Sequence, residues 1–367
     1  MAIPYRDSLI SASPPRTTRT TCGKFATLYF SSSRYTLHLR YISREILLST
    51  NLQLEHTIHT PLDFHGVGLH SGAAVSMRLV PAPAGSGIVF RRSDLDNFEI
   101  PATGRNVARV SYATSLMRQG VLIQTTEHLL SALIGLGVDN VIVEIDNLEV
   151  PILDGSSLPY VSAILATGLK RQRRKREYLR ILKSVEVREN SPSGDKFIGV
   201  YPGDGYSIHY AIDFPEPIGH DTFSGDLEAG AYADLIAPAR TFGFKEDEAM
   251  LRDMGLIRGV SDDSAIIVTR TTPTHPGTVL NGPLRFPDEF VRHKVLDLIG
   301  DLALAGRRIW GRVVAERAGH AMHTALVQKL LHDRSAWELT HRSEAASIAE
   351  DSPAKSPALA GLHSLHA

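Results

Sequence analysis

Two apolar segments of this 367-residue chain share one pattern: leucines at helical spacing, a closing glycine, then a strand-like run. The first is TTEHLLSALIGL followed by VDNVIVEI, and the second is FVRHKVLDLIGDLALAG followed by IWGRVVAER. Aligning His128 with Asp297 makes Leu129, Leu130, Leu133 and Gly137 fall on Leu298, Ile299, Leu302 and Gly306. This internal repeat predicts an α+β fold of two similar domains, each a sheet layered against helices. We expect the domains to pack helix face to helix face.

Composition separates these two domains from the rest of the chain. Residues 1–50 hold seven Lys or Arg and fifteen Ser or Thr, but only Asp7 and Glu45 as acids. That composition is typical of an organelle transit peptide and equally of a start codon assigned too early, so both interpretations stay open. The basic run at 169–180 is interpreted as a solvated linker between domains. We predict a disordered extension (1–50), two α+β domains (51–170 and 171–338) and a disordered tail (339–367).

Charge and cysteine content restrict the partners and the metal ligands. The formal net charge is −1, whereas nucleic acids and anionic membranes favour strongly basic surfaces. No run approaches the roughly 18 to 20 apolar residues that cross a bilayer. The only cysteine, Cys22, lies in the extension, which excludes a disulfide framework and a thiolate metal site. Small molecules or neutral partners fit this charge better, and no protein partner is evident. We predict a cytoplasmic protein, with organelle targeting by residues 1–50 as the alternative.

Three polar residues recur at four-residue steps in the second apolar segment: His293, Asp297 and Asp301. Positions four apart drift only about 40° around a helix, so these side chains share one face. By itself such spacing is typical of a solvated polar face. In the first segment, however, His128 also lies opposite a leucine face. If the repeat is real, two facing helices bring His128 and Asp297 to one cleft.

Two imidazoles and one carboxylate form a ligand set for catalytic zinc, which leaves a further position open for water. His128, His293 and Asp297 supply this set. Glu127, beside His128, is the candidate general base. Its alternative role is that of a first-turn acid favouring the helix N-terminus, with Thr125 or Thr126 as cap.

An amide leaving group also needs a proton donor on the far side of the reacting carbon. His320, in AGHAM, is the candidate, and His323 one turn later competes with it for the assignment. Neither an HEXXH zinc motif, a phosphate-binding glycine loop nor a nucleophile elbow is present. The chemistry therefore depends on one predicted metal site.

At these residues the chain resembles a known family, the UDP-3-O-acyl-N-acetylglucosamine deacetylases. Six segments between about residues 52 and 338 carry the resemblance in family order: GVGLHSG (66–72), TTEHLLSALIGLGVDN (125–140), PILDGSSLPYV (151–161), ARTFGF (239–244), DEFVRHKVLDLIGDL (288–302) and GHAMH (319–323). The resemblance implies a zinc amidase with its active site between the helical faces. It implies hydrolysis of the acetamide of UDP-3-O-(3-hydroxyacyl)-N-acetylglucosamine to acetate and a free amine, the committed step of lipid A synthesis.

The resemblance also implies roles for individual residues. The zinc ligands fall on His128, His293 and Asp297, the general base on Glu127, the histidine that assists the leaving amine on His320, and its supporting carboxylate on Asp301. Lys294 and Thr241 match positions near the polarised carbonyl, where they would stabilise developing negative charge. Phe242 and His70 match substrate-binding positions.

Some alternatives stay open at this point. After ARTFGF, Lys245, Glu248 and Asp262 stand where the family is usually apolar, so the acyl-chain preference is undetermined. The chain could be a non-catalytic relative that binds metal or sugar nucleotide, or a zinc amidase for another N-acetylated sugar. Iron in place of zinc, and the oligomeric state, are also open. The amphipathic substrate implies transient membrane proximity without an anchor.

Overall fold

The structure is a computed structural model that describes residues 53–108, 110, 112–190, 194–227 and 230–342. These residues fall within one compact unit. The predicted extension (1–50) and residues 343–367 of the predicted tail (339–367) lie outside the described residues, whereas Leu339 and Thr340 end a strand and Arg342 is buried, so the disordered tail cannot begin at residue 339. The predicted domain division at residue 170 is not tested and stays a prediction.

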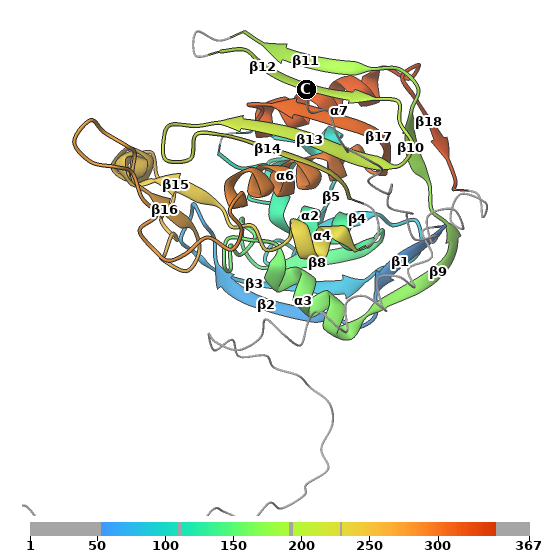
Figure 1. Ribbon diagram of the computed structural model, residues 1–367. Helices are drawn as coiled ribbons and strands as arrows, with labels where there is room; N and C mark the ends of the chain where they lie inside the picture. Colours follow the sequence, from blue (N-terminus) through green and yellow to red (C-terminus); the bar gives the residue numbers. More distant parts are fainter. Residues whose placement is uncertain (1–52, 109, 111, 191–193, 228–229, 343–367) are drawn as a thin grey trace, which may run out of the picture. The chain divides into compact units, whose positions relative to one another are not determined.

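Two large sheets, each drawn from one side of residue 170, organise the described residues (Figure 1). The five-stranded sheet has the order β2 (Leu62–Val67), β3 (Ala74–Pro81), β8 (Val141–Ile145), β4 (Ile88–Arg92) and β5 (Phe98–Pro101). The seven-stranded sheet has the path β11 (Val185–Glu189), β12 (Lys196–Tyr201), β17 (Arg308–Glu316), β10 (Tyr178–Ile181) and β18 (Trp337–Thr340), with β13 (Tyr206–Asp213) and β14 (His220–Asp226) joined through β17. Two-stranded pairs are β1 (Leu54–Ile58) with β9 (Leu169–Lys175), β6 (Leu116–Arg118) with β7 (Val121–Ile123), and β15 (Phe242–Phe244) with β16 (Ile266–Val268).

The helices complete the mixed α+β class, which confirms that part of the prediction. They are α2 (Glu127–Leu136), α3 (Leu158–Thr167), α4 (Ala231–Leu235), α5 (Glu248–Asp253), α6 (Glu289–Leu302) and α7 (His320–His332), with short 3-10 turns at Gly104–Asn106, Lys245–Asp247 and Ala303–Ala305. The leucine faces of α2 and α6 are buried in a hydrophobic core that also receives residues from both large sheets. No helix among these is both long and apolar enough to cross a membrane.

Helices α2 and α6 pack directly on each other, and Figure 1 places them between the two large sheets. Their approach depends on Gly300, because a Cβ there would overlap the backbone oxygen of Glu127. α2 ends at Gly137, whose φ of 88° is the left-handed conformation that favours glycine at a helix C-terminus. The repeated helix and closing glycine of the sequence are therefore real features of the backbone.

Thr126 is the N-cap residue of α2, one of the two predicted, but its side chain makes no capping hydrogen bond. The Thr125 hydroxyl donates to Glu149 Oε1 at 2.8 Å, and the Thr126 hydroxyl to the backbone oxygen of Thr114 at 3.3 Å. Thr125 has a φ of 56°, a conformation that a β-branched residue rarely adopts. The bond to buried Glu149 helps hold this turn, which directs the chain into α2.

The basic run at 169–180 contains β9 and the start of β10, and most of its charged side chains are exposed as expected, but Arg176 is buried. Leu169–Lys175 forms β9, antiparallel to β1. Arg176 follows it and is only 1% exposed. Its guanidinium donates to both carboxylate oxygens of Asp139, at 2.8 and 2.6 Å, and to the backbone oxygen of Gly137. A buried ion pair at the C-terminus of α2 therefore explains part of the basic composition.

Candidate metal centre and its surroundings

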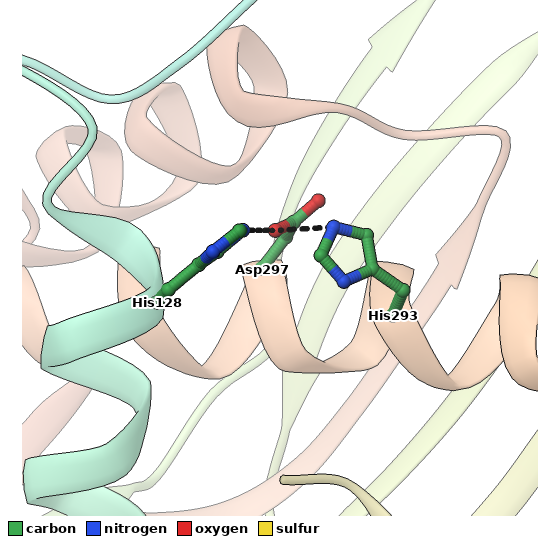
Figure 2. A group of neighbouring side chains, drawn as sticks. All are labelled: His128, His293 and Asp297. Atoms are coloured by element: carbon green, nitrogen blue, oxygen red, sulfur yellow. Dashed lines mark ion pairs between the residues drawn. The ribbon is translucent and has the colours of Figure 1, made fainter. Parts of the chain in front are cut away.

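The three predicted ligands converge where α2 crosses α6 (Figure 2). His128 comes from α2, whereas His293 and Asp297 lie one turn apart on α6. The Nε2 atoms of His128 and His293 each lie 3.4 Å from Asp297 Oδ1. Their rings meet edge to face, with centroids 5.0 Å apart. The face that sequence alone would leave solvated is buried, since all three residues are at most 5% exposed.

The geometry of this cluster fits a metal ion better than hydrogen bonds. Asp297 Oδ1 is buried and has no hydrogen-bond partner among the described residues. A distance of 3.4 Å is long for an N–H···O bond, yet two donors about 2.0–2.1 Å from a tetrahedral ion lie roughly 3.3 Å apart. A cation between the three atoms would satisfy the oxygen that the protein leaves unpaired.

The ionisation of the cluster also suits a cation. Burial, aided by His128 and Lys294, lowers the pKa of His293 to about 3, so its imidazole is neutral at pH 7. Its Nδ1 donates to the backbone oxygen of Ala239 at 3.1 Å, which directs the Nε2 lone pair towards the centre. Burial opposes the charge of Asp297, but His293 and Lys294 outweigh it and hold the pKa of Asp297 well below its ordinary value.

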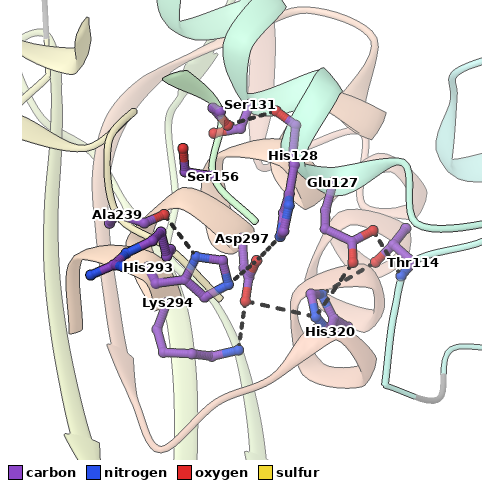
Figure 3. Close-up of polar contacts among 12 residues, drawn as sticks. Thr114, Glu127, His128, Ser131, Ser156, Ala239, His293, Lys294, Asp297 and His320 are labelled. Carbon is purple, nitrogen blue, oxygen red and sulfur yellow. Dashed lines mark hydrogen bonds and ion pairs between the residues drawn. The ribbon is translucent and has the colours of Figure 1, made fainter. Parts of the chain in front are cut away.

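Glu127 and His320 lie next to each other on one side of the three ligands (Figure 3). Glu127 Oε2 accepts the backbone N–H of Thr114 at 3.1 Å, while Oε1 faces His320 Nε2 at 3.9 Å. The same Nε2 lies 3.8 Å from Asp297 Oδ2. Burial raises the pKa of Glu127 to about 7. Burial disfavours the charged form of His320, but Asp301 and Asp297 prevail and raise its pKa to about 9.

Asp301 forms a second cluster behind His320. It is fully buried, and its Oδ2 accepts from His320 Nδ1 at 2.7 Å and from His323 Nδ1 at 2.8 Å. Its Oδ1 accepts from the Thr114 hydroxyl at 2.5 Å. The predicted pairing of Asp301 with His320 is therefore present in the structure.

Comparison with known proteins identifies the family. A family model described as LpxC, UDP-3-O-acyl N-acetylglycosamine deacetylase, matches residues 55–332. The chain belongs to this family. Among relatives named UDP-3-O-acyl-N-acetylglucosamine deacetylase, that of Solibacter usitatus is 50% identical over 296 residues, 81% of this chain and 97% of its own length. That of Myxococcus xanthus is 44% identical over 287 residues (78% and 88%), and that of Idiomarina loihiensis is 41% identical over 313 residues (83% and 99%).

The remaining predicted residues of this deacetylase family member lie around the centre at different distances. Lys294 donates to Asp297 Oδ2 at 2.7 Å, so its ammonium directly contacts one of the three candidate metal ligands. The ring of Phe242 lies 6.1 Å from that of His293. Thr241 is held through its backbone, donating to the oxygen of Gly155 at 2.8 Å and accepting from Ile266 at 2.7 Å.

His70 is buried at the edge of the same region. Its backbone N–H donates to Glu149 Oε1 at 2.9 Å, while its Nε2 has no hydrogen-bond partner among the described residues. Burial lowers the pKa of His70 despite the opposite effect of Glu149, and the nearby His320 and His128 lower it further. His70 is therefore a neutral imidazole with one unused nitrogen.

Sequence reasoning missed two groups that hold this site together. Thr114 binds both Glu127 and Asp301, and the backbone oxygen of Ala239 orients His293. Thr114 belongs to no motif, and it lies 187 positions from Asp301. A backbone oxygen carries no signal in residue type at all. Proximity in the fold is what reveals both.

Proposed function

We propose that this family member hydrolyses the acetamide of UDP-3-O-(3-hydroxyacyl)-N-acetylglucosamine to acetate and a free amine, with zinc held by His128, His293 and Asp297. The observation that carries the metal assignment is the buried, unpaired Asp297 Oδ1 between two Nε2 atoms at 3.4 Å. Family membership supports the substrate. Iron would suit the same ligands, because imidazole and carboxylate bind both metals.

A bound divalent metal at such a site supplies Lewis acidity, polarising a carbonyl and lowering the pKa of water. Glu127 takes a proton from the attacking water. Its Oε2 is occupied by the N–H of Thr114, so Oε1 is the atom that receives the proton. With a pKa of about 7, Glu127 is near the value at which a base works best at neutral pH.

His320 gives a proton to the leaving amine as the C–N bond breaks. Its Nδ1–H is bound to Asp301, so Nε2 is the nitrogen that faces the centre and donates. Because its pKa is about 9, His320 carries that proton at neutral pH. The water oxygen ends in acetate, and the nitrogen leaves as the amine.

Three further residues are proposed to bind or polarise the substrate. Lys294, whose ammonium donates to Asp297, and the hydroxyl of Thr241 are proposed to stabilise the negative charge that the carbonyl oxygen gains. Phe242, beside His293, is proposed to line the sugar or acyl site. The unused Nε2 of His70 is the proposed hydrogen-bonding group for a polar part of the substrate.

Two further parts of the account are also proposals. The packing of α2 on α6 supports two similar domains joined at their helical faces. A cytoplasmic site of action follows from a nucleotide-sugar substrate, and the substrate's acyl chain favours transient membrane proximity.

The experiment is acetate release by the full chain from the acylated UDP-sugar, before and after chelation and after return of zinc. We expect turnover that chelation abolishes and zinc restores. UDP-N-acetylglucosamine without the acyl chain is the control substrate. Binding without acetate release would favour the non-catalytic alternative, and faster release from the control would favour an amidase for another sugar.

A further inference from the structure

His323 is a buried histidine to which the proposed reaction assigns no task. It lies on α7 one turn after His320 and is fully buried. The rings of the two histidines are 5.9 Å apart. A buried imidazole of this kind is ordinarily a satisfied part of the core, so its contacts must distinguish a structural role from a functional one.

The contact that matters is with Asp301. His323 Nδ1 and His320 Nδ1 both approach the same oxygen, Oδ2, at 2.8 and 2.7 Å. An ionised carboxylate only accepts, so both Nδ1 atoms carry the proton. With Thr114 on Oδ1, the carboxylate is held by three donors and cannot turn about its Cβ–Cγ bond without losing one. His323 thus helps determine which oxygen His320 meets.

The other nitrogen of His323 ties this arrangement to the sheet. Nε2 lies 3.1 Å from the hydroxyl of Tyr210, a buried residue of β13. With its proton on Nδ1, a neutral His323 accepts at Nε2, so the single Tyr210 hydroxyl proton is shared between this nitrogen and the backbone oxygen of Ala318, which lies 2.7 Å from the hydroxyl and two residues before His320. The side chain of His323 therefore connects Asp301 to a strand that does not itself carry a residue of the proposed reaction.

We propose that His323 is a positioning residue for deacetylation: acting through Asp301, it holds His320 with Nδ1–H inward and Nε2 towards Glu127 and Asp297. This inference rests on the proposed function of His320. The two nitrogens of His323 have separate tasks, Nδ1 in orienting the carboxylate and Nε2 in anchoring to Tyr210. If His323 were purely structural, losing the contact of either nitrogen would not affect kcat differently.

Two substitutions separate the nitrogens. The amide nitrogen of Asn stands as many bonds from Cβ as His Nδ1, and that of Gln as many as His Nε2. His323→Asn keeps the donor to Asp301, whereas His323→Gln keeps only the contact with Tyr210. We expect kcat to fall about 10- to 100-fold in His323→Gln, as for a misplaced catalytic group, and to stay within about threefold in His323→Asn. KM and one metal per chain should be unchanged in both.

A double-mutant cycle tests whether His323 acts through Asp301. In an Asp301→Ala background, His323→Gln should cause no further loss of kcat, because the carboxylate that it orients is gone. His56→Gln is the matched control, since His56 is a buried histidine beside Arg176, remote from the reaction. It should lower Tm without changing kcat.

The outcomes separate this inference from the proposed function. An inactive wild type would overturn the deacetylase itself, whereas the inference fails if an active wild type gives equal kcat losses for Asn and Gln. It also fails if the kcat losses caused by His323→Gln and Asp301→Ala are additive. A kcat loss that is explained by reduced metal content, or that is accompanied by an equal change in KM, overturns it as well. Should His323→Gln not fold, His323→Met replaces it as a donor-free side chain. If neither folds while His323→Asn does, His323 serves stability alone and the proposal is overturned.

Discussion

Two clusters in this molecule each join one buried carboxylate to two imidazoles, and they differ in how the atoms meet. Around Asp297, the distal Nε2 atoms of two histidines stand 3.4 Å from an oxygen that has no hydrogen-bond partner among the described residues. Around Asp301, the proximal Nδ1 atoms of two histidines lie 2.7 and 2.8 Å from one oxygen. The first spacing leaves room for a cation, and the second is that of hydrogen bonds.

The difference shows that residue type alone does not determine the chemistry of such a cluster. Both contain two histidines and an aspartate, and both bring their ligand atoms within 4.8 Å of one another. The cluster of His128, His293 and Asp297 joins α2 to α6. The cluster of Asp301, His320 and His323 joins α6 to α7. We propose that this difference in backbone geometry makes Asp297 a metal ligand and Asp301 a hydrogen-bond acceptor.

The largest expected effect concerns Glu127, which touches both clusters. In Glu127→Gln, turnover should fall by about 10²- to 10⁴-fold, the usual contribution of a general base, while metal binding stays intact. Acetate release and metal content measure the two properties separately. Glu144→Gln, a partly exposed carboxylate on β8, is the control and should keep full turnover. Near-normal turnover in Glu127→Gln would assign the base elsewhere.

A smaller effect should follow from separating α2 and α6. In Gly300→Ala the new Cβ would meet the backbone oxygen of Glu127, so the helices must move apart. We expect the free energy of unfolding to fall by about 1–3 kcal/mol, as for other overpacked sites. Zinc affinity should weaken as well, because the proposed ligands are divided between these two helices.

Denaturant unfolding and zinc titration measure this effect. Gly243→Ala is the control, since a Cβ added at Gly243 would meet no atom within 4 Å and the backbone there is not left-handed. Its unfolding free energy should change by less than about 0.5 kcal/mol. Unchanged zinc affinity in Gly300→Ala would contradict the placement of the metal between the helices.

The smallest expected effect is a shift in the pH profile. The proposed reaction requires ionised Glu127 and protonated His320, so activity should rise through the pKa of Glu127, about 7, and fall through that of His320, about 9. A bound cation favours the carboxylate and disfavours the imidazolium, which moves both limbs to lower pH. In Asp301→Asn the carboxylate that raises the pKa of His320 is lost, so the basic limb should move further down.

The profile of kcat/KM against pH for wild type and Asp301→Asn measures this shift. The acidic limb should move less, because burial rather than Asp301 is the largest cause of the raised pKa of Glu127. If the basic limb does not move in Asp301→Asn, Asp301 does not set the pKa of His320.

Much of this site could be predicted from the sequence, for a physical reason. The four-residue spacing of His293, Asp297 and Asp301 must place them on one helical face, and the repeat led to His128 on another helix. Family membership is confirmed by the comparisons, and the structure brings the predicted ligands, Glu127 and His320 together. Their chemical roles stay predictions.

Other features depend on contacts that sequence patterns do not carry. The run 169–180 suggested a solvated linker because arginines are usually exposed; most of its charged side chains are exposed, but Arg176 is buried against Asp139. β9 pairs with β1, more than 100 residues earlier, and no local pattern marks that partner. The Thr125 turn is likewise held by a distant carboxylate, that of Glu149.

The most direct test of the two-cluster account is the zinc content of Asp297→Ala compared with Asp301→Ala. Each substitution removes one buried carboxylate from α6, so the variants are matched in helix, burial and residue type. Full chains reconstituted with zinc and freed of excess metal would be analysed by mass spectrometry for metal per chain. We predict nearly complete loss of zinc in Asp297→Ala and one zinc per chain in Asp301→Ala. Tight one-to-one zinc in Asp297→Ala, or its loss in Asp301→Ala alone, would contradict the account.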